Sequence, residues 1–343
     1  MTNSGQSKLT ISSATLPSGL SDGYEDADSA ADLELRKVTV PVPSHGERLD
    51  RTLAVIVPEF SRSYLQQLIE AGSVQLNAQT ATKTSVRVKA GDQLCIELRP
   101  TPQSQAFKPE QMTLNVMFED EHLLVIDKSA GLVVHPAPGN WSGTLLNGLL
   151  AHHEQARFLP RAGIVHRLDK DTSGLMVVAK GREVMDELVR MIADRTVIRE
   201  YVALAHGEWL GAKQRQVELP IGRDTRNRLR MAVVDLERHA GKSASTAIAM
   251  LQTESDYCLV RCRLHTGRTH QIRVHMASLG HPLVSDSLYG GKLAGGLIRQ
   301  ALHARRLEFK HPVTHDVLTF HAPLPADLQA AINNLGLSYN QIS

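Results

Sequence analysis

Residues 164–180, IVHRLDKDTSGLMVVAK, place a dense group of charged side chains between two apolar runs. Both runs are typical of buried strands, because they are short, apolar and contain β-branched residues. Charged side chains are costly to bury without partners, so the segment between the runs must leave the core. The sequence therefore predicts a sheet with a charged loop between two of its strands.

Further strand candidates lie on both sides of this segment. The stretch 182–195 instead has apolar residues at the spacing of an amphipathic helix. Neither a repeat of fixed period nor a regular alternation of strands and helices is found. We therefore predict an α+β fold, in which a mixed and mostly antiparallel sheet is flanked by helices and loops. The other predicted strand regions are 114–136, 200–209, 243–252, 257–265, 307–312 and 317–323.

Composition divides the chain into five parts. Residues 21–35 contain acids without a Lys or Arg, in a region poor in large apolar residues. Two helices, 48–58 and 61–72, are predicted before the alternating stretch 73–98, which predicts a small β-hairpin. The predicted parts are a disordered acidic tail (1–36), a helix-helix-hairpin module (37–98), a linker (99–112), the main domain (113–335) and a C-terminal tail (336–343).

Positive side chains recur along the small module, although the formal net charge of the whole chain is only +2. A basic surface and an acidic tail can coexist within such a balanced total. Clustered Lys and Arg bind the phosphates of nucleic acid, but they also serve as ordinary surface charge, and the pattern leaves both interpretations open. The candidates are Arg48, Arg51, Arg62, Lys83, Arg87 and Lys89.

Simple counts argue against several classes of protein. No stretch approaches the roughly 18 apolar residues of a membrane-spanning helix, and the first residues lack the apolar core of a signal peptide. The three cysteines, Cys95, Cys258 and Cys262, form no CxxC pair, which argues against a disulfide framework or a zinc ribbon. We therefore expect a cytoplasmic protein without membrane contact, in which Cys258 and Cys262 are buried thiols on one strand face.

Asp169 stands between Arg167 and Lys170 in the charged loop. Neighbouring cations favour the ionised form of a carboxylate, so Asp169 could act as a nucleophile, a general base or a metal ligand. A loop aspartate can equally cap a turn, and Asp171 competes for any chemical role. Spacing alone leaves these alternatives open.

A protein kinase catalytic loop also begins with His-Arg. That loop requires Asp directly after the Arg, where this chain has Leu168. The sequence also contains no Gly-rich nucleotide loop, no Asp-Phe-Gly and no P-loop. We therefore exclude phosphoryl transfer.

The stretch 264–282, LHTGRTHQIRVHMASLGHP, concentrates Arg, His and Gln. It contains no HExxH pattern and no carboxylate, so we expect no metal. These side chains are the ones expected around phosphates and exposed bases, and a strand here would divide them between a core face and a site face. A second stretch, 221–234, predicts either a phosphate-tracking edge or the solvated tip of a hairpin. Its basic residues are Arg223, Arg226, Arg228 and Arg230.

Together these stretches resemble the RluA/RluD-type pseudouridine synthases, which isomerise uridines in large-subunit ribosomal RNA. The similar segments are HRLDKDTSGLMVVAK (166–180, the catalytic motif), REYVALAHG (199–207), TGRTHQIRVHM (266–276), LLVIDKSAGLVVHP (123–136) and ALHARRLEFKHP (301–312). Residues 37–98 resemble a small RNA-binding module that also occurs in a small-subunit ribosomal protein. The resemblance covers about residues 40–325 and is closest to the RluD branch, whose substrate is the helix 69 stem-loop.

The resemblance implies roles for single residues. Asp169 matches the catalytic aspartate, and Arg273 matches the arginine that pairs with it. Tyr201, a packing residue by its strand pattern alone, matches a tyrosine that contacts the target base and is a candidate for handling a proton. Arg167 matches the arginine that fills the gap left by the flipped base. The RNA-binding candidates are Arg167, Arg268, His270, Gln271, Arg51, Arg62 and Arg228, and Leu302 and His303 match a motif near the pocket.

The implied reaction cuts the base from carbon one of the ribose, turns it and rejoins it through its carbon five. It needs no redox step and no energy input, so no cofactor is implied. The carboxylate could attack the sugar, attack the ring or assist a glycal-type path, and the sequence does not choose between them. The family pattern is broken at Ser129, Ser285 and Ser287, which are turn positions.

The expected partner is large-subunit rRNA or a pre-ribosomal particle, bound by a monomer. Two alternatives remain at this point. The same reaction could occur at other rRNA uridines, as in the sister branch, or the chain could be a non-catalytic RNA-binding factor for ribosome assembly. The joint presence of Asp169, Tyr201 and Arg273 argues against the second alternative.

Overall fold

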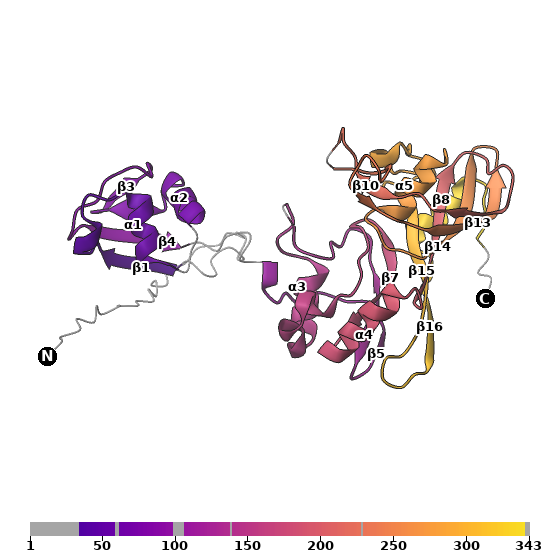
Figure 1. Cartoon of the computed structure of the whole chain (residues 1–343), viewed down its shortest axis with the longest axis horizontal. Coiled ribbons are helices and arrows are strands. Elements are labelled where there is room, and N and C mark those ends of the chain that lie inside the picture. The colour runs from indigo at the N-terminus through magenta and orange to yellow at the C-terminus, as the bar shows by residue number, and fades with distance from the viewer. Residues whose placement is uncertain (1–33, 59–61, 99–105, 138, 228, 340–343) are drawn as a thin grey trace, which may run out of the picture. The chain divides into compact units, whose positions relative to one another are not determined.

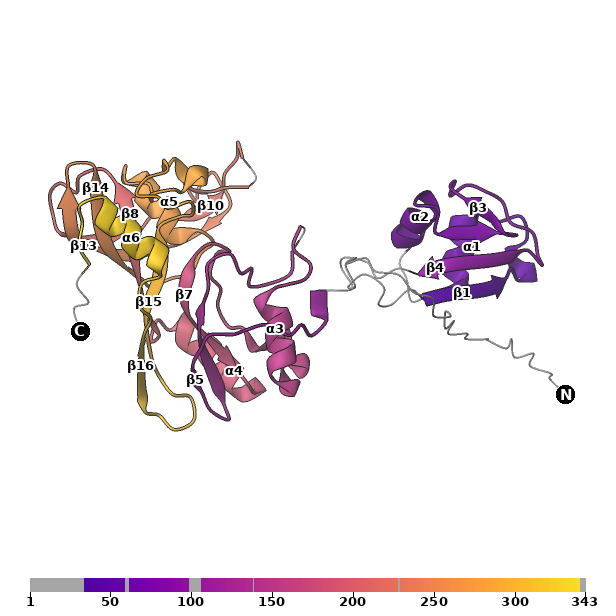
Figure 2. The same cartoon turned by 180° about the vertical axis from the view of Figure 1, so that it is seen from behind.

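The computed structural model describes residues 34–58, 62–98, 106–137, 139–227 and 229–339. The chain divides into two compact units, Met1–Gln105 and Ala106–Ser343, which are described separately (Figures 1 and 2). Within the described residues, no helix is long and apolar enough to cross a membrane.

The first unit packs two helices against a four-stranded antiparallel sheet with the strand order β1-β4-β2-β3. Apolar residues from the helices, such as Leu53 and Ile69, share one core with strand residues such as Ile96. The elements are β1 (Glu34–Thr39), the 3-10 turn η1 (Val42–Ser44), α1 (Leu49–Ile56), α2 (Arg62–Glu70), β2 (Val74–Leu76), β3 (Gln79–Ala81) and β4 (Gln93–Leu98).

The strand β1 differs from the sequence expectation. It begins at Glu34, inside the range 1–36 that composition assigns to a disordered tail, and residues 1–33 lie outside the described residues. The strand pairs with β4 along its whole length, with Leu35 opposite Glu97 and Arg36 opposite Ile96. Backbone pairing with β4 therefore orders residues whose acidic surroundings predict disorder.

The second unit is built on a nine-stranded sheet with the order β5-β6-β7-β15-β8-β14-β13-β9, and β16 pairs with β15 (Figure 1). Every pairing is antiparallel except that of β7 with β15, which confirms a mixed, mostly antiparallel sheet. The strands are β5 (Val116–Glu119), β6 (Leu123–Lys128), β7 (Ser173–Ala179), β8 (Ile198–His206), β9 (Gln214–Val217), β13 (Thr246–Glu254), β14 (Tyr257–Leu264), β15 (Leu302–Lys310) and β16 (Val317–His321).

Helices cover both faces of this sheet because its central strands are apolar on both sides. Alternate residues of β7 join different cores: Met176 packs with α3 (Leu145–His152), while Val177 packs with α4 (Arg182–Ala193). The α4 bounds confirm the helix predicted from the amphipathic stretch 182–195. The remaining helices are α5 (Gln271–Ser278) on the α3 face and α6 (Ala326–Asn334), which packs on β8 residues of the opposite face.

The polar stretch around residue 271 is a helix, not a strand. Residues 271–276 of α5 are all buried, so the helix lacks the exposed face that normally reveals a helical period. The alternation of Ile272, Val274 and Met276 imitates a strand pattern. His270 caps the helix in the left-handed region, with φ of 57°.

Two predicted boundaries also differ from the structure. Residues 106–110, expected in a linker, pack on α3, where the Asn147 side chain donates to the Lys108 carbonyl at 2.8 Å. Leu337, expected in a C-terminal tail, is buried beside Leu328 because the chain turns back at Gly336, whose φ is 76°. Residues 99–105 and 340–343 lie outside the described residues.

Gly174, the second residue of β7, allows a close approach of two backbones. Its φ is 113°, and a Cβ placed there would lie 2.2 Å from the Ala304 carbonyl oxygen of β15. We expect Gly174→Ala to lower the free energy of unfolding by about 2–4 kcal/mol, because it adds both a clash and backbone strain. Urea unfolding of both proteins measures this difference.

Gly181 provides the matched control. A Cβ there meets no atom within 4 Å, and the backbone is extended with φ of −140°. Gly181→Ala should therefore change the free energy of unfolding by no more than about 1 kcal/mol. Equal effects of the two substitutions would contradict the proposed role of Gly174.

Candidate active site

Distant segments hold the backbone of the charged loop that precedes β7. The buried ammonium of Lys128 donates to three backbone carbonyl oxygens, including that of Lys170 at 2.9 Å. Arg299 donates to the Asp171 carbonyl at 3.0 Å. Burial lowers the pKa of Lys128 to about 8, so the ammonium form prevails at neutral pH. The loop is thus fixed by its backbone, which leaves its side chains free to face the site.

Asp169 lies against the guanidinium of Arg273, which contacts two carboxylates at once. The Nη1 of Arg273 donates to Asp169 Oδ2 at 2.9 Å. The Nε and Nη2 of Arg273 donate to Asp286 at 2.7 and 2.8 Å. The side chains of Asp169, Arg273 and Asp286 are 15%, 8% and 1% exposed. Burial opposes the charge of Arg273, but the hydrogen bonds to Asp286 and the charge of Asp169 outweigh it and raise the pKa of the guanidinium.

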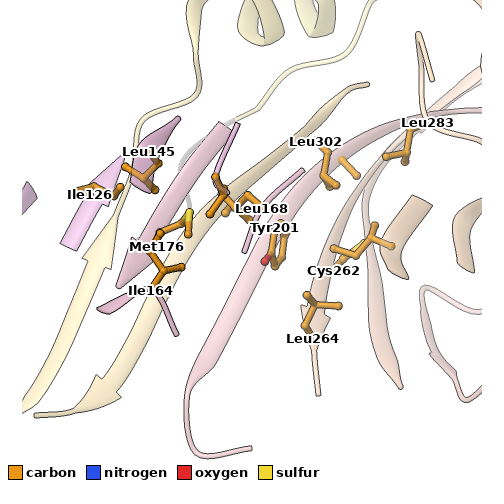
Figure 3. Packing of buried hydrophobic residues seen from close by; sticks show 14 of the residues in the cluster. Ile126, Leu145, Ile164, Leu168, Met176, Tyr201, Cys262, Leu264, Leu283 and Leu302 are labelled. Atoms are coloured by element: carbon orange, nitrogen blue, oxygen red, sulfur yellow. The ribbon is translucent and has the colours of Figure 1, made fainter. Parts of the chain in front are cut away.

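Tyr201 is the third residue predicted to be catalytic, and it shares a recess with Asp169 and Arg273. It projects from β8 into the core, and Figure 3 shows its ring among Leu168, Leu302 and Cys262. Burial raises the pKa of Tyr201 to about 12, with Asp169 adding to the shift. The phenol is therefore neutral at physiological pH. The structure thus brings together residues from three separate sequence motifs.

A larger cavity of about 490 Å³ opens beside these residues, with Asp169 and Tyr201 in its wall. Asp169 is the only acid among its lining residues, whereas five arginines surround the same space. A cavity with this charge suits an anionic ligand. The arginines are Arg161, Arg167, Arg195, Arg199 and Arg268.

Of the predicted RNA-binding residues in this unit, Arg167, Arg268 and His270 line the cavity. Gln271 does not, because its amide is fully used within the protein. Its Oε1 accepts from the Thr266 hydroxyl and from the Arg268 backbone, and its Nε2 donates to Ser245 and Thr246. Gln271 thus braces the loop, and it also lines the smaller recess that holds Asp169, Tyr201 and Arg273, so its contact with RNA stays a prediction. Arg228 lies outside the described residues.

His270 and Tyr289 form a second layer around the carboxylate. The His270 Nδ1 lies 2.8 Å from the Tyr289 hydroxyl, and its Nε2 lies 3.8 Å from Asp169 Oδ1. The Arg273 guanidinium packs 4.9 Å from the centre of the Tyr289 ring. Met231 donates its backbone N–H to the Tyr289 hydroxyl at 3.0 Å. This tyrosine therefore links the Asp169–Arg273 pair to the hairpin of β10 (Ile221–Arg223) and β11 (Met231–Val233).

The two RNA-binding candidates of the first unit are both on helices and partly exposed. Arg62 donates to the buried carboxylate of Asp50 at 2.7 Å, and Arg51 lies 3.3 Å from Glu47. Arg48 also contacts Asp50, at 3.0 Å. Asp50 therefore holds two arginines side by side at the surface of this unit.

Several site residues carry little or no sequence signal. Asp286 stands in an ordinary turn sequence, VSDSLYGG, and its pairing with Arg273 is visible only in the fold. Arg199 does carry a signal, because it lies two residues before Tyr201 on a strand and therefore points to the same face. His303 is buried and bonds Ser173 at 3.0 Å, so it supports β7 rather than the cavity wall.

The partly buried His166 makes stability depend on pH. Its Nε2 accepts the Val177 N–H at 3.1 Å, and burial lowers the pKa of the ring to about 3. An unfolded histidine titrates near pH 6.5, so the unfolded state alone binds this proton as the pH falls below that value. Stability is consequently lost on acidification, by about 1.4 kcal/mol per pH unit for this one group.

His166→Gln keeps an acceptor for the Val177 N–H but cannot bind the proton. Between pH 6.5 and 5, we expect the variant to lose about 2 kcal/mol less of its free energy of unfolding than the wild type. Urea unfolding at both pH values measures the difference, in which the titration of all other groups cancels. Parallel pH profiles would contradict the neutral state of His166.

Among the described residues, no group of three His, Cys, Asp or Glu side chains is arranged to hold a metal ion. All three cysteines are free thiols, and Cys258 and Cys262 are buried as predicted. The ionisable side chains that line the cavity are one carboxylate, one phenol, four imidazoles and five guanidinium groups.

Known proteins are similar to this chain in both sequence and fold. Residues 122–278 match the family model described as RNA pseudouridylate synthase, and residues 47–94 match the S4 domain. "Ribosomal large subunit pseudouridine synthase D" of Neisseria meningitidis serogroup B (strain MC58) is 45% identical over 333 residues, covering 92% of this chain and 87% of the relative. The protein of the same name from Nitrosomonas europaea is 46% identical over 310 residues, covering 87% of this chain and 88% of the relative.

Solved structures show the same fold. "Human RNA Pseudouridylate Synthase Domain Containing 1" superposes with a TM-score of 0.50 at 25% identity, covering 64% of this chain and 87% of that one. "Human RNA Pseudouridylate Synthase Domain Containing 4" gives a TM-score of 0.51 at 24% identity, covering 66% and 94%.

Proposed function

Because the chain belongs to the RluA/RluD-type family of RNA pseudouridine synthases, closest to the RluD branch, we propose that it converts specific uridines of large-subunit rRNA to pseudouridine. The target region is the helix 69 stem-loop, and Asp169 is the nucleophile. The placement of Asp169 carries the proposal. It is the only carboxylate lining the cationic cavity, and one of its oxygens is held by Arg273.

The reaction is an isomerisation, so its atoms balance without a second substrate. The bond from ribose carbon one to N1 breaks, a bond from the same carbon to C5 forms, C5 loses a proton and N1 gains one. The ionised Asp169 would attack the sugar or the ring, or assist a glycal-type path. In each path Arg273 orients the carboxylate and balances its charge in a site with little solvent.

Tyr201 is proposed to contact the target base and to take part in moving the C5 proton. Since the pKa of Tyr201 is raised to about 12, it enters the reaction as a neutral phenol. It can accept the C5 proton only as its own proton leaves, in a relay to a second acceptor. The target uridine must leave its stack to reach this recess, at a cost of a few kcal/mol. Arg167 would then fill the vacated position in the RNA.

The first unit would supply affinity rather than chemistry. Arg51 and Arg62 would contact phosphates of the rRNA, with Asp50 holding Arg62 in place by the 2.7 Å ion pair. Arg268, His270 and Gln271 would contact the RNA near the cavity, and Arg228 remains a further predicted RNA contact. We propose no cofactor for this reaction.

Incubation of the full-length protein with unmodified large-subunit rRNA tests the proposal. Pseudouridines are mapped by carbodiimide treatment and reverse transcription, on the free transcript and on precursor particles. New signals within helix 69 are expected. New signals only at other uridines would contradict the proposed target but keep the proposed reaction. If no new pseudouridine appeared in either the free transcript or the precursor particles, the proposed function would be overturned.

A further inference from the structure

Arg199 is a buried cation without an anionic partner. It lies on β8 two residues before Tyr201, so both side chains point to the face that lines the large cavity. The residue is only 6% exposed, and its Nε has no hydrogen-bond partner. No ion pair joins Arg199 to a carboxylate within the part of the chain that the structure describes.

The position of the Arg199 head group follows from Gly267. A Cβ at Gly267 would lie 3.0 Å from the Arg199 Nη1, so the guanidinium rests directly against the loop that carries Arg268 and His270. Arg199 therefore reaches from the sheet to the cavity wall opposite. Gly267 leaves the space that this reach requires.

An unpaired guanidinium is costly to bury, and two other buried arginines of this unit avoid that cost by pairing with carboxylates. Arg273 contacts Asp286 and Asp169, and Arg299 contacts Asp327 at 2.6 Å. Burial lowers the pKa of Arg199, which is the expected effect when no anion compensates the charge. An anionic ligand in the cavity would supply the counter-charge that Arg199 lacks.

The cavity limits what that anion can be. The cavity has a volume of about 490 Å³, and five arginines and one acidic residue, Asp169, are among the residues that line it. A uridine that enters such a space brings the phosphodiesters on its two sides with it. A phosphodiester supplies two non-bridging oxygens, which match the paired N–H groups of a guanidinium.

We propose that Arg199 binds a phosphodiester that flanks the target uridine and so sets the depth to which the flipped nucleotide enters the cavity. This inference rests on the proposed function. It assigns a binding role to Arg199, which lies beside the three residues predicted to be catalytic but is not one of them. Arg199 is a substrate-binding residue here, and Gly267 is a positioning residue.

RNA binding is measured in full-length protein carrying Asp169→Asn, which prevents turnover during the titration. The probe is a helix 69 stem-loop RNA, titrated at several salt concentrations. Arg199→Met should weaken binding by about 10- to 100-fold, as expected for a lost charged hydrogen bond. The slope of log K against log salt should also shrink by about 0.7, the contribution of one phosphate contact to a single strand. Arg199→Lys keeps the charge and should preserve the slope.

Arg305→Met is the matched control. Arg305 is also 6% exposed with an unpartnered Nε, but it lies beside His321 and Tyr339 in a separate cavity that excludes Asp169. Both substitutions remove a buried arginine, so both can lower stability. Only Arg199→Met should change the salt slope.

A neutral methylphosphonate, placed at one phosphate of the RNA at a time, identifies the partner. At one phosphate next to the converted uridine, the methylphosphonate should weaken RNA binding by the protein with Arg199 intact about 10-fold or more. The same methylphosphonate should not further weaken RNA binding by the Arg199→Met protein. The 5′ and 3′ positions are separate arms of this test. The inference is overturned if both proteins respond equally at every position, or if the sensitive phosphate does not flank the target.

The wild-type protein is assayed for pseudouridine formation on the same RNA. If the wild-type protein forms pseudouridine but no flanking methylphosphonate weakens binding through Arg199, only the proposed role of Arg199 is contradicted. Absence of conversion contradicts the proposed target, whereas the binding comparison still reports on Arg199.

Discussion

Asp169→Asn should reduce pseudouridine formation by roughly 10⁴-fold or more. Asparagine keeps the shape of the side chain and can still accept the hydrogen bond that Arg273 donates at 2.9 Å. It cannot act as a nucleophile, so every path that requires an attacking carboxylate is blocked. Single-turnover assays on the rRNA substrate measure the rate, and RNA affinity should change only several-fold.

Asp171→Asn is the control for this loss. Asp171 lies in the same loop, where its backbone carbonyl accepts a hydrogen bond from Arg299 at 3.0 Å. Since the backbone makes that contact, the substitution should leave activity within several-fold of the wild type. If the Asp171 variant were the inactive one and the Asp169 variant kept its activity, the assignment of the nucleophile would be wrong.

Arg273→Met should be the most damaging substitution for stability, with an expected loss of about 3–5 kcal/mol. It leaves two carboxylates without a counter-charge, and the side chain of Asp286 is only 1% exposed. Activity should fall with stability, because Asp169 also loses the group that orients it. Urea unfolding at pH 7 measures the first effect, and single-turnover assays measure the second.

Two further measurements distinguish lost pairing from lost packing. Adding Asp286→Asn to the Arg273→Met variant should restore part of the stability. Arg182→Met, which breaks the exposed pair with Asp186 on α4, should have little effect. An equal loss at Arg182 and Arg273 would rule out burial as the cause.

The α+β class was predictable because a sheet that is covered on one or both faces imposes strong patterns on its strands. The strand β7 and the helix α4 follow those patterns and lie where they are expected. The strand β1 does not, since its order comes from pairing with β4, more than 50 residues away. The helix α5 was missed because residues 271–276 are buried on every side and show no helical period.

The site was predictable only in part. Asp169 and Arg273 are 104 positions apart, so no local spacing can connect them, and the family resemblance supplied the connection. Asp286 and Lys128 make contacts with residues distant in the sequence, and the local sequence around each of them does not indicate these partners. The structural role of Gln271 was not predictable for a related reason. A polar side chain in a polar motif can make all its hydrogen bonds within the protein, as the four hydrogen bonds of the Gln271 amide show.

The parallel pairing of β7 with β15 has a consequence for biosynthesis. Ser173, at the start of β7, bonds His303 of β15 across 130 positions of sequence, and Arg299 reaches the catalytic loop across 128. At about 5–20 residues per second, the ribosome adds those residues roughly 7–27 s after it has made Asp169. The nascent chain therefore carries Asp169 well before it can anchor the loop. We expect competence to arise only near the end of translation, so that a chain released early would hold the aspartate and lack the site.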